Sequence, residues 1–204
     1  MKNQNPETIE KLDQAFKAVL DGLHQMGYDV PGDDNFKGTS LRAAKGFAEL
    51  VLPPEYIDKQ IQEMLGKVFP TDDADGMVVS RNNFAVGLCP HHLLPVVMRI
   101  TCAYVPKDKV LGISKLSRIS KLLAHKPVLQ ETLSTQIARV LFEGLDSKGS
   151  AVMIHATHMC MALRGVESHE TQVVTSKLYG IFKDQPQTRK EFYDICRAGM
   201  PQLF

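Results

Sequence analysis

The feature that most constrains this chain is a pair of short runs, far apart in the sequence, that carry thiol and imidazole side chains. The first run is Cys-Pro-His-His at residues 89–92, and the second ends with His-Met-Cys at residues 158–160. Thiolate and imidazole are ligands that zinc favours, and a catalytic zinc takes three protein ligands and keeps one position open for water. Cys89, His92 and Cys160 form such a set. A fold that uses this set must bring two distant segments onto one ion.

Two further histidines stand beside these candidate ligands. His91 and His92 are adjacent, so we expect one to bind the ion and the other to remain free as an acid or base near neutral pH. On an extended strand, His158 and Cys160 would point to the same side, roughly 6–7 Å apart along the chain. The pattern indicates metal-activated water flanked by two imidazoles, which suits hydrolytic attack on an electrophilic carbon.

The alternative is a structural zinc site, which would be closed by a fourth protein ligand. Cys102 is the spare thiol nearest in sequence, but it lies within a predicted strand, where a free cysteine usually serves as a small buried hydrophobe. His155 is the spare imidazole, and strand alternation turns it away from Cys160. The spacing therefore favours a catalytic over a structural metal.

Composition limits the partners of the chain. The 204 residues carry a formal net charge of +1, so no overall field attracts nucleic acid or an anionic membrane. The residues near the start lack the apolar core of a signal peptide, and no window approaches 18 uninterrupted apolar residues. The four cysteines, two of them beside histidines, favour a reducing compartment. We expect a cytoplasmic protein that binds neither nucleic acid nor membrane.

The first part of the chain, residues 1–70, reads as a helical N-terminal arm. Apolar residues recur every three or four positions over residues 7–27, and similar patterns begin near Thr39 and cover 55–67. Arg42 and Lys45 lie three positions apart on the second of these helices, which places two cations on one face. Residues 72–76 form a predicted turn.

The second part, residues 71–204, alternates strands with a helical pair. Its predicted elements are strands over 77–80, 83–88 and 96–105, helices over 117–125 and 127–145, strands over 151–161 and 171–182, and a terminal helix over 187–197. The order β-β-α-α-β-β predicts an α+β domain in which the helices are segregated to one face of the sheet.

Several motifs, in order, resemble those of the GTP cyclohydrolase I family. They are Cys-Pro-His-His-Leu-Leu-Pro at 89–95, Val-Leu-Gly-Ile-Ser-Lys-Leu-Ser-Arg-Ile at 110–119, Gln-Glu at 130–131 and His-Met-Cys-Met-Ala-Leu-Arg-Gly-Val at 158–166. The resemblance runs from about residue 77 to 195 and covers the arm more loosely. It implies a tunnelling-fold (T-fold) subunit of a toroidal homodecamer, with active sites where subunits meet.

The implied reaction opens the imidazole ring of GTP and expels C8 as formate. The ribose then rearranges to give 7,8-dihydroneopterin triphosphate, in the first step of tetrahydrofolate and pterin biosynthesis. By the same resemblance, zinc binds Cys89, His92 and Cys160, while His91 and His158 transfer protons.

The resemblance also assigns substrate contacts. Glu131 is the expected guanine anchor, with Gln130 beside it, although a carboxylate in a first helical turn is also favoured by the helix dipole alone. Ser114 matches a serine near the ribose. The basic residues expected to bind the triphosphate are Lys115, Arg118 and Arg164, joined by Arg42 and Lys45 from the arm across a subunit interface.

The chain departs from the family pattern at two places. Pro90 stands where the family usually has Glu, and proline fixes φ, removes a backbone N–H and supplies no carboxylate. Gly38 and Thr39 precede the basic helix where the family usually has Thr-Pro. Two alternatives therefore stand beside a zinc-dependent GTP cyclohydrolase. One is a T-fold relative that acts on another purine or pterin, and the other is a non-catalytic, zinc-stabilised nucleotide-binding oligomer.

Overall fold

The computed structural model describes residues 5–72 and 76–198, so most of the predicted turn at 72–76 lies outside the described residues. The chain divides into two compact units, Met1–Leu52 and Pro53–Phe204. The predicted arm extends to residue 70, whereas the structural division falls earlier, so the third predicted helix belongs to the second unit.

The first unit consists of helices α1 (Pro6–Gln25) and α2 (Thr39–Leu50), joined through the short 3-10 helix η1 (Asp34–Phe36). The Asn5 side chain caps α1 by accepting a hydrogen bond from the backbone N–H of Glu7. The Phe16 and Phe47 rings meet edge to face at 6.2 Å between centroids and join the two helices. Both predicted helices of this unit are confirmed.

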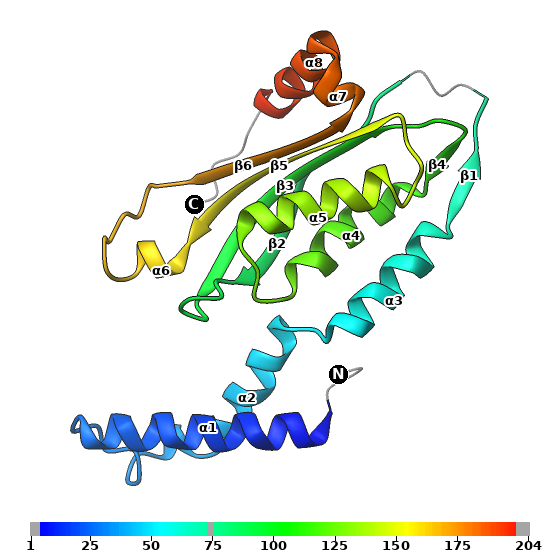
Figure 1. Ribbon diagram of the computed structural model, residues 1–204. Coiled ribbons are helices and arrows are strands. Elements are labelled where there is room, and N and C mark those ends of the chain that lie inside the picture. Colours follow the sequence, from blue (N-terminus) through cyan, green and yellow to red (C-terminus); the bar gives the residue numbers. More distant parts are fainter. Residues whose placement is uncertain (1–4, 73–75, 199–204) are drawn as a thin grey trace. The chain divides into compact units, whose positions relative to one another are not determined.

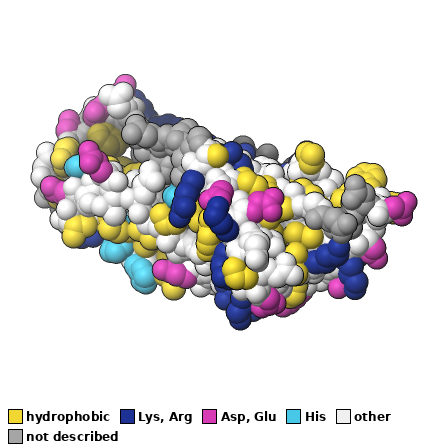
Figure 2. Space-filling model, turned by 90° about the horizontal axis from the view of Figure 1, so that it is seen from above, with side chains coloured by type: hydrophobic (Ala, Val, Ile, Leu, Met, Phe, Trp, Pro, Cys, Tyr) yellow, Lys and Arg dark blue, Asp and Glu magenta, His cyan; other side chains and the backbone are white. Residues whose placement is uncertain are grey.

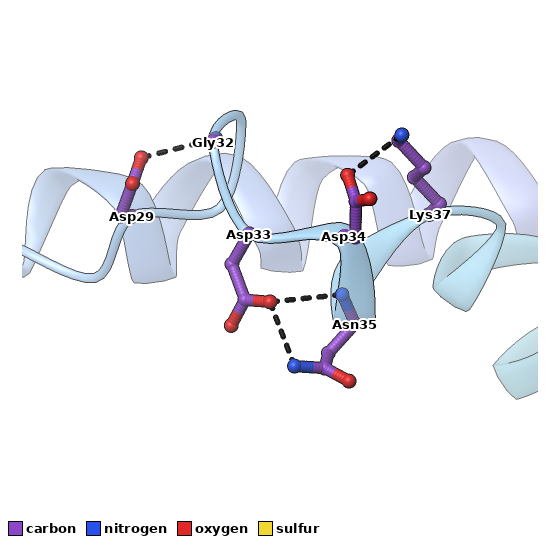
Figure 3. A network of polar contacts seen from close by, with 6 residues as sticks. All are labelled: Asp29, Gly32, Asp33, Asp34, Asn35 and Lys37. Atoms are coloured by element: carbon purple, nitrogen blue, oxygen red, sulfur yellow. Dashed lines mark hydrogen bonds and ion pairs between the residues drawn. The ribbon is translucent and has the colours of Figure 1, made fainter.

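Short-range polar contacts shape the loop between α1 and α2 (Figure 3). Asp29 accepts a hydrogen bond from a backbone N–H three residues further on, and Asp33 accepts from both the backbone and the side-chain nitrogen of Asn35. Lys37 pairs with the Asp34 carboxylate at 2.6 Å. Aspartates of this kind replace backbone turn hydrogen bonds, so the loop is held by its own side chains.

The second unit is built on a four-stranded antiparallel sheet in the order β2-β3-β5-β6 (Figure 1). The strands are β2 (Val78–Leu88), β3 (Pro95–Val105), β5 (Gly149–His158) and β6 (Val173–Gly180). Leu88 pairs with Pro95, and Val96 pairs with His158. This register brings the β2–β3 hairpin loop and the end of β5 to the same end of the sheet.

Helices α4 (Ile113–Ala124) and α5 (Gln130–Phe142) cover one face of this sheet (Figure 1). Their apolar stripes bury Leu116, Ile119, Leu133 and Ile137. Gly87 allows the close approach of α4, because a side chain there would meet the Ala124 carbonyl oxygen at 2.7 Å. The predicted helical pair is confirmed, and the mixed architecture is α+β as expected.

Two further helices, α7 (Ile181–Asp184) and α8 (Pro186–Arg197), pack against the opposite face at the other end of the strands. Phe182 and Phe192 are fully buried there with Ala103 and Ala151. The prediction that all helices lie on one face is therefore wrong. Alternate residues of β3 and β5 are apolar on both faces at this end, so a second helical layer is needed to cover them.

The third predicted helix and two short strands that were not predicted complete the unit. Helix α3 (Pro54–Leu65) leads into β1 (Val68–Pro70), which pairs with β4 (Lys109–Leu111) in a two-stranded sheet. The Tyr104 hydroxyl oxygen accepts a hydrogen bond from the Leu111 N–H at 2.8 Å, which ties β4 to the main sheet. Two three-residue strands are too short to show an alternating pattern.

The strand predicted over 151–161 stops earlier in the structure than expected. It ends at His158, and a four-residue helix, α6 (Met159–Ala162), follows at once. The partner strand β3 begins at Pro95, which has no N–H to continue the ladder, so the chain beyond His158 is released to turn. Cys160 therefore lies on a helix rather than beside His158 on a strand.

None of the helices in the described ranges is long and apolar enough to cross a membrane. Figure 2 shows Lys and Arg side chains interspersed with Asp and Glu over the face in view, rather than gathered into a patch of one sign.

Candidate active site

The β2–β3 loop holds the first pair of candidate ligands. The Cys89 N–H donates to the Leu94 carbonyl at 2.9 Å, and the Leu93 N–H donates back to the Cys89 carbonyl at 2.8 Å. Leu93 adopts a left-handed φ of 53°, which tightens the loop. As a result, the Cys89 Sγ and the His92 Nδ1 lie 3.7 Å apart.

Cys160 on α6 completes the set. The ligand atoms of Cys89, His92 and Cys160 all lie within 4.8 Å of one another. Tetrahedral zinc with Zn–S of about 2.3 Å and Zn–N of about 2.0 Å places sulfur and nitrogen ligands about 3.5 Å apart. The Cys89–His92 distance matches this value, and the Cys160 sulfur lies within 4.8 Å of both, so the three side chains can close around one metal ion.

The electrostatics of the two thiols also suit a cation. Burial raises the pKa of the Cys160 thiol above its usual value, and the neighbouring Cys89 sulfur raises it further. The Arg164 guanidinium acts in the opposite direction. A divalent cation bound here would supply the charge that stabilises the Cys160 thiolate.

His91 remains outside the three-ligand group. Its Nδ1 lies 3.9 Å from the Cys89 Sγ, but its side chain is exposed and its ring centroid is 6.3 Å from that of His92. His92 is exposed as well, so the expectation that only one of the two adjacent histidines binds the ion stays a prediction.

His158 lies at the end of β5, and its Nε2 is 2.8 Å from the Gln130 Oε1. Burial lowers the pKa of His158 below its usual value, and the Glu131 carboxylate acts in the opposite direction. Gln130, the first residue of α5, is buried, and its Nε2 donates to the carbonyls of Ile154 and Val173 at 3.2 and 3.0 Å. Sequence reasoning missed these backbone partners, because they depend on the pairing of β5 with β6.

A cavity of about 270 Å³ joins these groups. Its polar lining comprises the three candidate ligands, His91, Gln130, Glu131 and His158, and its apolar lining includes Val128, Leu129 and Met161. No motif in the sequence indicated the apolar lining. Thiols, imidazoles and a carboxylate thus converge in one pocket from the β2–β3 loop, the start of α5, the end of β5 and α6.

Within one chain, the α4 residues predicted to contact the substrate do not line this pocket. Ser114, Lys115 and Arg118 are absent from its lining. Helix α4 starts beside β4 and ends at Ala124 near the pocket, so at about 1.5 Å per residue Ser114 lies roughly 15 Å along the helix from that end. Arg164, in contrast, follows α6 and lies close enough to Cys160 to affect its pKa.

The remaining two predicted basic residues lie in the first unit. Arg42 donates to the Lys37 carbonyl at 2.7 Å and to the Thr39 hydroxyl at 2.8 Å, so its guanidinium holds the start of α2. Lys45 is partly buried on the same helix.

Comparisons with known proteins agree on one family. Residues 14–197 match the family model described as GTP cyclohydrolase I. The chain is 39% identical over 189 residues to GTP cyclohydrolase 1 of Alkalilimnicola ehrlichii, covering 93% of this chain and 98% of that protein. It is 39% identical to the Rattus norvegicus protein of the same name, covering 97% and 79% of the two chains, and 35% identical to one from a Synechococcus species, covering 95% and 83%.

Proposed function

The chain belongs to the GTP cyclohydrolase I family, and on this premise we propose that it hydrolyses the imidazole ring of GTP to give formate and 7,8-dihydroneopterin triphosphate. The observation that carries the proposal is the convergence of three metal-ligand side chains with His91, His158 and Glu131 around one cavity. Such a product would feed tetrahydrofolate and pterin synthesis, and the four free cysteines suit a reducing cytoplasm.

Zinc is the ion that we assign to Cys89, His92 and Cys160. Two sulfurs and one imidazole are a donor set that zinc favours, and three protein ligands leave a fourth position open. When bound, zinc would lower the pKa of water to near neutrality and so supply the nucleophile for C8.

His158 and His91 have the proton-transfer roles. Because burial favours the neutral imidazole of His158, this side chain can accept a proton at neutral pH. His91 is exposed at the pocket mouth beside Cys89, where it can exchange protons with solvent. The two imidazoles approach the cavity from different segments, so one can take a proton while the other donates one.

Glu131 is proposed as the anchor for guanine. It lines the cavity in the first turn of α5, and a carboxylate there can accept two N–H donors from a guanine edge. Gln130 precedes it with its side chain directed inward, so the recognition of the base would fall mainly on Glu131.

The triphosphate would be bound by Lys115, Arg118 and Arg164, with Arg42 and Lys45 contributing from the arm, and Ser114 would lie near the ribose. Because the α4 residues lie away from the pocket of their own chain, we propose that a second copy supplies them. This arrangement requires a homo-oligomer, for which we propose the T-fold toroidal decamer implied by the family resemblance.

The test is an assay of metal-quantified protein with GTP that follows formate and, after oxidation, the fluorescent pterin. We expect both products to increase in proportion to zinc content. Formate without pterin would limit the activity to ring opening. Neither product from a zinc-loaded, intact oligomer would overturn the proposal.

A further inference from the structure

The amide group of Gln130 is fixed by its surroundings. Gln130 is 4% exposed, and its Nε2 lies within hydrogen-bond distance of the carbonyl oxygens of Ile154 and Val173. Carbonyl oxygens only accept hydrogen bonds, and a glutamine amide has two N–H donors. Both donors are therefore used, and the reversed orientation would place three oxygens against one another.

This orientation determines the proton on His158. The Gln130 Oε1 faces the His158 Nε2 at 2.8 Å, and an amide oxygen can only accept. The His158 Nε2 must therefore carry the hydrogen. In a neutral imidazole the other nitrogen, Nδ1, then has a free lone pair, because the hydrogen bond at one ring nitrogen sets the state of the other.

We propose that Gln130 is a positioning residue that holds the His158 ring in place as the Nε2–H tautomer, with Nδ1 as its hydrogen-free nitrogen. The tautomer follows from the hydrogen bonds alone, whereas its catalytic use rests on the proposed function.

The proposal separates the roles of two adjacent residues. The Gln130 side chain has no N–H left for a ligand, so its effect on the substrate passes through His158. Glu131, next along the helix, is exposed and lines the cavity, where its carboxylate is available to a base. Consecutive helical residues point about 100° apart, which explains why one faces the sheet and the other the pocket.

The first test measures the tautomer directly. Zinc-loaded protein labelled with ¹³C,¹⁵N-histidine is sedimented and its ring nitrogens are observed by solid-state NMR, with the His158 signals identified by their loss in His158→Gln. We expect the nitrogen coupled to Cδ2, which is Nε2, to carry the hydrogen, and the nitrogen coupled to Cγ, which is Nδ1, to be bare. A hydrogen on Nδ1 of the neutral ring would overturn the proposal.

The second test compares Gln130→Met with Ser134→Ala. Ser134 is the matched control, because it is also buried on α5 and joins it to β6 through the Thr175 hydroxyl at 2.7 Å, without contacting His158. For Gln130→Met we expect kcat to fall about 10- to 100-fold, with zinc content unchanged and KM within about twofold. Ser134→Ala should leave kcat nearly unchanged.

An unchanged kcat in Gln130→Met, or an equal loss in Ser134→Ala, would contradict the positioning role. A rise in KM at constant kcat would instead show that Gln130 binds the base directly, which also overturns the proposal. If the unmodified protein releases no formate from GTP, the proposed function fails, and the NMR measurement still decides the tautomer.

Discussion

The two ends of the four-stranded sheet are built in opposite ways. At one end, α7 and α8 close over an apolar cluster in which Phe182 and Phe192 meet edge to face at 5.8 Å. At the other end, the cavity holds thiols, imidazoles and a carboxylate that are only partly covered. Burying polar groups costs free energy. The residues that stabilise the fold and those proposed for the chemistry therefore lie at opposite ends of the strands.

Helix α4 runs between these ends, with Lys115 in its first turn and Arg118 near its middle. Neither residue lines the pocket of its own chain, although the proposed chemistry needs both at a pocket. Substitutions at each end, and on α4, should consequently affect different measurable quantities.

The largest expected effect is from Cys160→Ala. Removing one of three ligands should abolish stoichiometric zinc binding and reduce formate release below detection, because two remaining ligands hold the ion poorly. Metal content is measured by elemental analysis beside the GTP assay.

Cys102→Ala is the matched control. Burial raises the pKa of this thiol to about 11, and its sulfur contacts Ser120 and Asn83 away from the pocket. It should retain zinc and turnover. Retention of zinc by Cys160→Ala would remove this residue from the metal site.

Phe192→Ala tests the stable end. Deleting a fully buried aromatic ring should lower the free energy of unfolding by about 3–5 kcal/mol, since it leaves a cavity beside Phe182. Denaturant titration measures this change. Phe84→Ala, at a ring that is 43% exposed, should cost about 1 kcal/mol or less.

Below the unfolding transition, Phe192→Ala should still bind zinc and release formate. Loss of zinc from the folded variant would show that packing under α7 and α8 affects metal binding at the other end of the sheet. The two ends would then not be independent.

Arg118→Ala tests the proposed phosphate contact from α4. Loss of a charge-assisted phosphate contact of about 1.5–3 kcal/mol should raise the KM for GTP about 10- to 100-fold, with zinc content unchanged. Arg139→Ala removes an exposed arginine of α5 that pairs with Glu143, and it should leave KM unaltered.

Co-expression with Cys160→Ala then asks whether one site uses two chains. Each variant alone is impaired in a different part of the site, so mixed oligomers should regain activity at the interfaces that combine two intact parts. Mixed oligomers that are no more active than the separate variants would place Arg118 and Cys160 in the same chain's site.

Much of the fold was predictable because the signals are local. The helices over α1, α2, α5 and α8 follow from apolar periodicity, and the strands β2, β3, β5 and β6 follow from extended apolar runs. The helical layer at the stable end was partly missed, since four-residue α7 is too short for a periodic pattern, and which face α8 covers depends on tertiary packing.

The site was predictable at the level of residue types and not of geometry. The spacing of Cys89 and His92 indicated a shared ligand role, and the structure brings their ligand atoms together with that of Cys160. Cys160 was expected on a strand, but the proline that begins β3 ends the ladder at His158. The inward role of Gln130 depends on backbone carbonyls of two other strands, which sequence spacing does not reveal.

The smallest expected effect concerns Pro90, at the mouth of the pocket. The two backbone hydrogen bonds that shape its loop use the N–H groups of Cys89 and Leu93, so the loop does not depend on an N–H at residue 90. Pro90→Glu restores the residue usual in the family, and because the position is exposed, stability should change by about 0.5 kcal/mol or less.

For Pro90→Glu we expect zinc content to be unchanged. We expect kcat to stay within about twofold, because the two backbone hydrogen bonds that shape the loop do not use residue 90. Pro90→Ala separates the two properties of the substitution, because it restores the N–H without adding a carboxylate. A tenfold gain in kcat for the glutamate variant alone would show that a carboxylate at this position performs chemistry that the metal-binding end of this chain otherwise lacks. An equal gain for both variants would instead trace the effect to the freedom of the loop backbone.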